Sequence, residues 1–479
     1  MEASGNSKVL KASIVYVLVS LINKGIGIIT VPVFTRLLST AEMGVTTTWI
    51  SWMTILLPIT TLSLVTASLY IAFKEYPDKR DSYQSSVLVL STLSTVFFLV
   101  IYLIFHDILN KVFTLSTDLM VFMFLYLIFS PALDMWMLRQ RYEYKTKQMA
   151  IVTLISNIMA SFVAVNLVLF FKESNYNLGT LRVYGTYAVT GLFGVVFYYK
   201  ILKDGRVLFD REFWKFGLKI SVPLIFHTLA KNLLDVSDRS MISIFNGKDA
   251  VGIYGTIYSI STLSLIVWTA INNAFIPYLY DKLERNEKKG IADVKQISYI
   301  MIIIYGGACI ILTAIAPEIV KLLTTDAYYE AVHIMPPVAA GIFLTCVYNL
   351  FANVILFHKK SVGVMVATMI AAVTNIVLNA IFIPKFGYIA AAYTTLVAYI
   401  ILSIFQGGVM KRVHKDSLYN MSLISIISVI VVLSCLVFNI LYSMTAIRYA
   451  IIIIFIVVGA INYKKIIGVL NMLKSKGSF

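Results

Sequence analysis

The chain has 479 residues, of which 59% are hydrophobic and 13% charged, and its mean hydropathy is +0.84. Soluble globular domains are far more polar, so this composition excludes them and indicates a helical protein that crosses the membrane many times. The formal net charge of +16 is then explained by basic cytoplasmic loops, and no nucleic-acid partner is expected.

Hydropathy predicts an all-α fold with about fourteen spans, since each crossing needs about 20 apolar residues. The spans cover residues 9–35, 45–73, 82–105, 115–137, 148–171, 178–200, 214–238, 250–278, 296–316, 331–357, 361–384, 386–410, 418–442 and 446–470. An even number puts both termini on one side, and most of the 40 Lys and Arg residues fall in loops on that side. The positive-inside rule therefore predicts a multi-pass protein with both termini in the cytoplasm.

Two further features concern the ends and the cysteines. The N-terminus shows no small-residue cleavage site after a short apolar core, so we expect the first span to stay in the mature protein. Cys309, Cys346 and Cys435 lie singly in apolar runs. Their odd number and wide spacing fit no disulfide or metal pattern, so we expect small core residues and no metal site.

An internal repeat relates the two halves of the chain. Sliding the sequence by 208 residues places Gly44 on Gly252 and Gly179 on Gly387. The same offset pairs Thr48 with Thr256, Ser51 with Ser259, Thr54 with Thr262, Thr186 with Thr394, and LKAS at 10–13 with LKIS at 218–221. Because six spans separate the copies, the repeats are predicted to be parallel and related by a pseudo-twofold axis along the membrane normal.

This repeat predicts two six-helix lobes that face each other across a cavity. The N-terminal lobe covers residues 1–200 and the C-terminal lobe covers 214–410. A strongly basic cytoplasmic loop, 201–219, joins them, and 411–479 adds two helices and a cytoplasmic C-terminus. Basic clusters in other inner loops, such as 139–147, indicate topology determinants or contacts to anionic lipid.

The seventh predicted span carries an unusual number of ionisable residues. His227, Lys231, Asp235 and Asp238 lie within an arc of roughly 80° if the segment is helical. Charges at this depth are costly unless they pair or face water, so the stripe predicts the wall of a wet cavity. The alternative is that Lys231 and Asp235, which are spaced i and i+4, neutralise each other.

The repeat adds a second lysine to this picture. The offset of 208 residues places Asn23 and Lys24 of the first span on Lys231 and Asn232 of the seventh. No acid lies in the first span, so Lys24 cannot be neutralised within its own helix. Two such lysines facing each other across a cavity would attract an anion, and Lys24 is therefore the strongest single candidate.

These observations define two sets of candidate site residues. We predict that the substrate is bound by Asn23, Lys24, Lys231, Asn232 and Arg239. We predict that a coupling ion, H⁺ or Na⁺, is bound by His227, Asp235 and Asp238, because these groups can bind a proton or a cation. Aromatic residues near the same helices could stack on sugars, although core packing is the more usual role for Trp49, Trp52, Tyr254, Tyr258 and Trp268.

Missing motifs narrow the function further. The sequence has no GxxxxGK[ST] phosphate loop, no long outer loop and no pair of catalytic carboxylates in a loop. This disfavours a nucleotide hydrolase and a membrane acyl- or glycosyltransferase. We therefore expect a secondary transporter, not an enzyme, with no cofactor.

Three segments resemble the polysaccharide-transporter branch of the multidrug/oligosaccharidyl-lipid/polysaccharide flippase superfamily. They are VPVFTRLLSTAEMGV at 31–45, LLDVSDRSMISIFNGKDAVGIYG at 233–255, and KFGYIAAAYTTL at 385–396. The resemblance implies a flippase like the Wzx type, which moves an undecaprenyl-pyrophosphate-linked oligosaccharide across the bacterial inner membrane for O-antigen, capsule or exopolysaccharide synthesis. It also implies work beside a polymerase and other glycan-assembly proteins.

Two alternatives within that superfamily stay open. Fourteen spans also resemble the lipid II flippases, but the predicted eighth span has no arginine, which departs from that type. A cation-coupled multidrug exporter would use Asp235 and Asp238 for the ion and the drug. More basic than acidic groups in the predicted cavity argue against cationic drugs.

Overall fold

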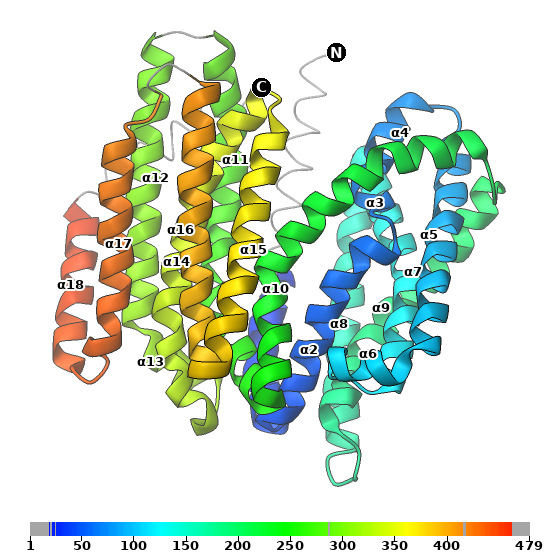
Figure 1. Ribbon diagram of the computed structural model, residues 1–479, viewed down its shortest axis with the longest axis horizontal. Coiled ribbons are helices and arrows are strands. Elements are labelled where there is room, and N and C mark those ends of the chain that lie inside the picture. The colour runs from blue at the N-terminus through cyan, green and yellow to red at the C-terminus, as the bar shows by residue number, and fades with distance from the viewer. Residues whose placement is uncertain (1–18, 20–21, 24, 286–287, 415–417, 462–479) are drawn as a thin grey trace. The chain divides into compact units, whose positions relative to one another are not determined.

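The computed structural model describes residues 19, 22–23, 25–285, 288–414 and 418–461. The predicted all-α class is confirmed, because 89% of the structure is helical and the described residues form no strand (Figure 1). The contacts divide the chain into two compact units, Met1–Gly255 and Thr256–Phe479. The lobe boundaries proposed from the repeat, 1–200 and 214–410, stay a prediction.

The first unit is a helical bundle that includes most of the long helix α10. Its helices are α2 (Thr40–Thr60), α3 (Leu64–Ala67), α4 (Leu69–Glu75), α5 (Arg80–Ile104), α6 (His106–Phe113), α7 (Thr117–Tyr142), α8 (Thr146–Phe170), α9 (Leu178–Gly205) and α10 (Arg211–Ser261). A capping box between Ser39 and Glu42 starts α2. Helix α9 packs against α5, α7 and α8, so it forms the centre of this bundle.

The predicted second span, 45–73, is not one continuous helix. Helix α2 ends at Thr60, and the chain passes through Leu62 (φ 54°) and Ser63 (φ 49°) before α3 and α4 begin. Pro58 lies just before the break and cannot donate a backbone hydrogen bond, which weakens the last turn of α2. Left-handed φ values are strained for a residue other than glycine. Two such residues in succession therefore mark this break as a candidate for a functional role.

A sharp turn also interrupts α10. Gly247 has φ 85° and ψ −176°, a conformation open to glycine because it has no Cβ. The turn lies between the seventh and eighth predicted spans, so the residues of α10 on either side of Gly247 form two separate helical segments.

The second unit is built around α14, most of whose residues are buried. Its helices are α11 (Ser264–Arg285), α12 (Lys288–Ala314), α13 (Ala316–Leu323), the 3₁₀ helix η1 (Asp326–Ile334), α14 (Met335–Phe357), α15 (Ser361–Phe386), α16 (Tyr388–Val413), α17 (Met421–Leu441) and α18 (Thr445–Ile461). Helix α14 contacts α12, α16 and α17. The three cysteines lie in α12, α14 and α17 and are free and buried, as expected of small core residues.

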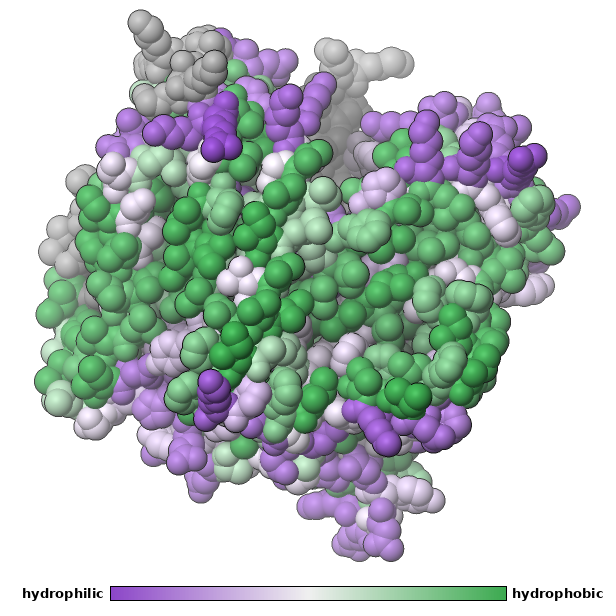
Figure 2. All heavy atoms as spheres, viewed as in Figure 1, coloured by the Kyte–Doolittle hydropathy of each residue, from purple (hydrophilic) through white to green (hydrophobic). Residues whose placement is uncertain are grey.

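The described helices are those of a multi-pass membrane protein. Nine are long and apolar enough to cross a bilayer, or ten if the bent pair α10 and α11 forms one span. Two shorter apolar helices, Gly25–Leu37 and Thr445–Ile454, accompany them. Figure 2 shows hydrophobic side chains along the middle of the helices and hydrophilic ones near the helix ends. The count of fourteen spans stays a prediction.

Candidate functional site in the first unit

The predicted ionisable stripe lies on α10, but its members differ widely in exposure. Lys231 is exposed, whereas His227 and Asp235 are half-buried. No ion pair joins Lys231 to Asp235 in the described part of the chain, so the self-neutralised alternative does not form in this structure. The Nδ1 atom of His227 is buried and has no hydrogen-bond partner among the described residues.

Asp238 is enclosed by protein. It is 1% exposed, and its Oδ2 accepts a 2.5 Å hydrogen bond from the Tyr254 hydroxyl. Its Oδ1 accepts a 2.7 Å hydrogen bond from the backbone N–H of Arg239, whose side chain is half-buried. Tyr254 lies beyond the Gly247 turn, so this contact joins the two segments of α10.

Asn232 compensates for the break in the second span. Its Nδ2 donates a 2.7 Å hydrogen bond to the backbone carbonyl of Thr54. That carbonyl would normally accept from residue 58, but Pro58 has no N–H to donate. Freed backbone groups in membrane helices must find partners inside the protein. Asn232 therefore helps to hold the broken span in addition to its predicted place at the substrate site.

A cavity of about 760 Å³, including its open mouth, lies beside this contact. Its lining comes from α2, α3, α7, α10 and the break itself: Leu57, Pro58, Thr61, Ser63, Val65, Thr66, Pro131, Asp134, Leu138, Arg141, Thr228 and Asn232. The wall combines an acid, a guanidinium, an amide and several hydroxyl groups. Irregular backbone at membrane depth is tolerated where it lines a polar cavity, and broken helices often form substrate or ion sites.

Sequence reasoning missed two charged members of this wall, Asp134 and Arg141. Both side chains are exposed to the cavity. A signal for Asp134 was available, because it is an acid that follows a long apolar run in the predicted span 115–137 and lies three residues after Pro131. Arg141 gave a weaker signal, because it lies in the basic segment 139–147, which was assigned to topology.

Helices α2 and α10 approach very closely at another point. A Cβ built on Gly44 would lie 1.9 Å from the carbonyl oxygen of Lys248, and one on Gly252 would lie 1.9 Å from that of Thr40. The Thr40 hydroxyl also donates to Asp249 at 2.5 Å. The offset of 208 residues that pairs Gly44 with Gly252 also pairs Thr40 with Lys248. The two contacts are therefore equivalent under the repeat.

The remaining predicted residues have mixed placements. Lys24 lies outside the described residues, and Asn23 is half-buried. Among the aromatic candidates, Trp52 is half-buried and packs edge-on against Phe113. The other four are buried: Trp49, Tyr254, Tyr258 and Trp268.

Two family models and one known protein match the sequence of this chain. The family model described as "Polysaccharide biosynthesis protein" matches residues 9–282, and the MatE model matches 223–381. An uncharacterized membrane protein of Methanocaldococcus jannaschii is 22% identical over 228 residues. That match covers 47% of this chain and 45% of the archaeal protein, so it spans less than half of either.

Solved structures of two transporter types have a similar fold. The lipid II flippase MurJ in an inward closed conformation aligns with a TM-score of 0.64 at 15% identity, over 95% of this chain and 100% of its own. An inward-facing multidrug resistance MATE family transporter aligns with a TM-score of 0.54 at 16% identity, over 83% and 96%.

Fold and family together define the class, a membrane transporter of the multidrug/oligosaccharidyl-lipid/polysaccharide flippase superfamily. Within that class the chain belongs to the polysaccharide biosynthesis protein family, whose model covers more than half of it.

Proposed function

We propose that this protein flips an undecaprenyl-pyrophosphate-linked oligosaccharide across the bacterial cytoplasmic membrane by alternating access. The observation that carries the proposal is the exposed Lys231 on α10, next in sequence to Asn232, which lines the polar cavity at the break in the second span. A pyrophosphate cannot cross hydrocarbon unaided, and a glycan adds many hydroxyl groups. A polar cavity with Arg141 in its wall, and Lys231 next in sequence to the wall residue Asn232, supplies what both need.

The polar groups of the cavity wall and the neighbouring Lys231 each have a role in this proposal. Lys231 and Arg141 attract the pyrophosphate, and Lys24, Arg239 and Asn23 are proposed to extend this anion site. Hydroxyl and amide groups of the cavity hydrogen-bond the sugars: Thr61, Ser63, Thr66, Thr228 and Asn232. The lipid tail stays in the bilayer, so only the polar part needs the protein.

Coupling to H⁺ or Na⁺ is assigned to the acidic groups and the histidine of the same unit. Asp235, Asp238 and His227 are the candidates from the sequence, and Asp134 joins them because it lies in the cavity wall. A carboxylate at membrane depth is costly, so binding a proton or a cation there is favourable. Exchange between such an ion and the substrate would link the gradient to transport.

A cation-coupled multidrug exporter is the second candidate. It is favoured by the MatE match over 223–381 and by the Asp134 carboxylate in the cavity, which could hold an amphipathic cation. A lipid II flippase shares the pyrophosphate chemistry and would differ in its glycan.

The test uses cells whose own glycan flippase has been deleted. We expect the wild-type chain to restore surface glycan, and Lys231→Gln to lose most of that activity. A charge-assisted contact contributes about 1.5–3 kcal/mol, which corresponds to a loss of roughly ten- to a hundredfold. Lys231→Arg should keep part of the activity, since it keeps the charge.

The matched control is Lys219→Gln, an exposed lysine nearer the start of the same helix that is not adjacent in sequence to a residue of the cavity wall. Membrane levels of every variant are checked by blot. Normal glycan in Lys231→Gln would remove Lys231 from the mechanism. Drug resistance from the wild-type chain, without rescue of glycan, would favour the exporter.

A further inference from the structure

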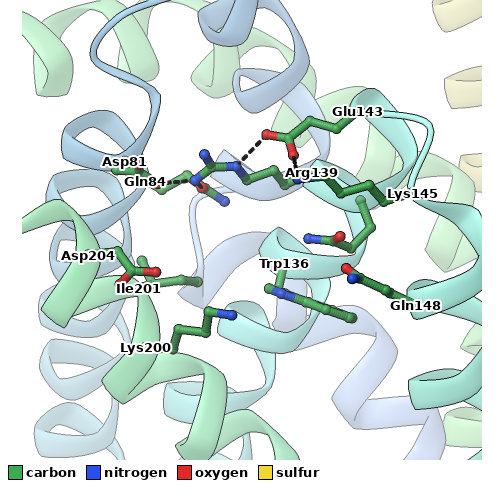
Figure 3. A pocket seen from close by; sticks show the side chains of 11 residues that line it. Asp81, Gln84, Trp136, Arg139, Glu143, Lys145, Gln148, Lys200, Ile201 and Asp204 are labelled. Carbon is green, nitrogen blue, oxygen red and sulfur yellow. Dashed lines mark hydrogen bonds and ion pairs between the residues drawn. The ribbon is translucent and has the colours of Figure 1, made fainter.

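A second pocket in the first unit shares no residue with the cavity at the broken span. It lies among the ends of α5, α7, α8 and α9 that are predicted to face the cytoplasm (Figure 3). Its empty space is about 710 Å³, including the open mouth. The lining residues are Asp81, Gln84, Trp136, Arg139, Gln140, Glu143, Lys145, Gln148, Lys200, Ile201 and Asp204.

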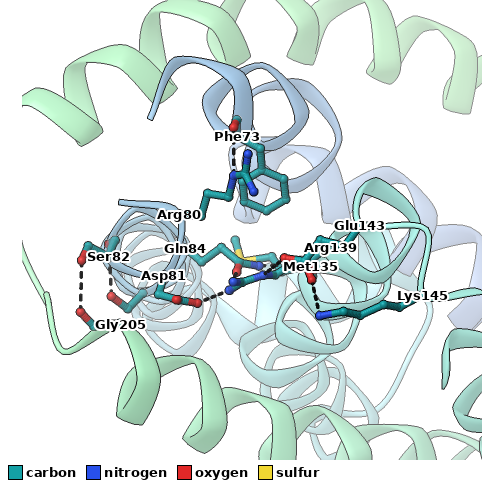
Figure 4. Close-up of polar contacts among 11 residues, drawn as sticks. Phe73, Arg80, Asp81, Ser82, Gln84, Met135, Arg139, Glu143, Lys145 and Gly205 are labelled. Atoms are coloured by element: carbon teal, nitrogen blue, oxygen red, sulfur yellow. Dashed lines mark hydrogen bonds and ion pairs between the residues drawn. The ribbon is translucent and has the colours of Figure 1, made fainter. Parts of the chain in front are cut away.

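One wall is a closed network centred on Arg139 (Figure 4). Arg139 pairs with Asp81, donates to Gln84 Oε1 at 3.0 Å, and pairs with Glu143 at 2.8 Å. Lys145 pairs with Glu143 from the other side at 2.6 Å. Burial raises the pKa of Glu143 and hydrogen bonds from Lys145 and Arg139 lower it, with a net fall. The charges of this wall therefore neutralise one another.

Three other polar groups of the pocket lack partners among the described residues. Lys200 and Asp204 of α9 are exposed, and neither forms an ion pair or hydrogen bond with any residue that the structure describes. Figure 3 shows the Lys200 ammonium pointing into the pocket. Gln140 is 6% exposed, and its buried Oε1 has no donor among the described residues. A buried amide oxygen without a donor is costly, so it indicates a missing partner.

These free groups define the chemistry of a ligand. A simple anion would pair with Lys200 but would be repelled by the carboxylate of Asp204. A simple cation would pair with Asp204 but would be repelled by the ammonium of Lys200. A zwitterion satisfies both, because its anionic group can pair with Lys200 while its ammonium pairs with Asp204 or donates to Gln140 Oε1.

The position of the pocket favours a lipid source for that zwitterion. The ends of membrane-crossing helices lie at the depth of the phospholipid headgroups. The neighbouring faces of α8 and α9 expose apolar side chains suited to acyl chains, among them Ile151, Ile155, Val196 and Tyr199. We propose that this pocket binds a phosphoethanolamine zwitterion, the headgroup chemistry of phosphatidylethanolamine, with Lys200 on the phosphate and Asp204 on the ammonium.

Native mass spectrometry of the full chain in detergent tests the proposal. We expect phosphatidylethanolamine adducts to exceed those of phosphatidylglycerol, which lacks the ammonium, and of phosphatidylcholine, whose ammonium cannot donate. Lys200→Gln and Asp204→Asn should each lower phosphatidylethanolamine binding about fivefold or more. Lys203→Gln, an exposed lysine on the same helix outside the pocket, is the matched control and should bind normally.

A competition experiment distinguishes the two possible ligands, a phospholipid headgroup and free phosphoethanolamine. If free phosphoethanolamine displaces the lipid, or binds alone in a manner that needs Lys200 and Asp204, the zwitterion site stands and its natural ligand is soluble. The proposal is overturned if phosphatidylethanolamine shows no preference and free phosphoethanolamine does not bind. It is also overturned if the two pocket variants bind like Lys203→Gln. These exposed substitutions should fold, and their melting temperatures check this.

Discussion

Helices α10 and α15, one in each unit, both carry polar side chains inside apolar sequence but use them differently. On α10, Lys231 is exposed and His227 keeps a buried nitrogen without a partner among the described residues. On α15, Asn375 and Asn379 are fully buried and hydrogen-bond to each other at 3.0 Å. Asn375 also donates to the Thr395 hydroxyl at 3.2 Å, and Asn379 accepts from Thr394 of α16.

The difference separates two uses of polarity in a membrane protein. A closed amide network satisfies its own donors and acceptors, so it fixes how α15 and α16 pack. Exposed polar side chains near a cavity contribute little to the stability of the fold and remain available to a ligand. The α15 residues should therefore govern stability, whereas the exposed α10 residues should govern transport.

The largest expected effect on stability comes from opening the amide network. Asn379→Ala removes the hydrogen bond to Asn375 Oδ1 and one of the two acceptors of the Thr394 hydroxyl, which keeps the Ala391 carbonyl at 3.0 Å, at a cost of roughly 2–3 kcal/mol. We expect a clear fall in the melting temperature in detergent. Asn166→Ala is the control, because Asn166 is exposed and, among the described residues, bonds only to the Phe162 carbonyl of its own helix. An unchanged melting temperature for Asn379→Ala would contradict the structural role of the α15 amides. An equal fall for Lys231→Gln would contradict the difference between the two helices.

An intermediate effect is expected where α2 meets α10. The added methyl group in Gly44→Ala would collide with the backbone of Lys248, and overpacking of this kind costs about 1–3 kcal/mol. Alanine favours a helix over glycine by about 1 kcal/mol, so a net loss must come from the contact. Thermal unfolding and glycan rescue measure the outcome. Gly191→Ala has room for its methyl group and serves as control; equal behaviour of the two would show that the close approach is unimportant.

The smallest effect concerns an ion pair in the second unit. Arg448 donates to both carboxylate oxygens of Glu318 at 2.9 Å. Burial raises the pKa of Glu318 and the Arg448 hydrogen bonds lower it, with a net fall below its ordinary value. The pair therefore contributes stability above the unfolded pKa of Glu318, and this contribution is lost as pH falls through the folded pKa.

Because Glu318 is 39% exposed, solvent screening should keep its contribution below about 1 kcal/mol. Melting temperatures are measured from neutral pH down to pH 4 and below. The wild type should lose its advantage over Glu318→Gln in the acidic part of that range, whereas exposed Glu173→Gln should match the wild type throughout. A constant difference between wild type and Glu318→Gln would contradict the assignment.

The sequence alone determined the class of this protein and indicated the residue pairs of its predicted repeat. Composition and hydropathy are local properties that decide whether a segment can span a bilayer, so they predicted an all-α, multi-pass chain. The match of Gly44 with Gly252 was visible in the sequence alone, and both glycines lie where α2 and α10 approach closely. Lys231 was singled out because a charge in an apolar span is costly wherever it lies.

Only the tertiary structure decided which polar groups share a site. The break at Leu62 and Ser63 lies within an apolar stretch, and the amide that supports it belongs to Asn232, far along the chain. Asp134 and Arg141 meet Asn232 only because α7 and α10 line the same cavity. Hydropathy records the cost of placing a group in the membrane, but contacts between distant helices depend on how their side chains pack, and that is a property of the whole fold.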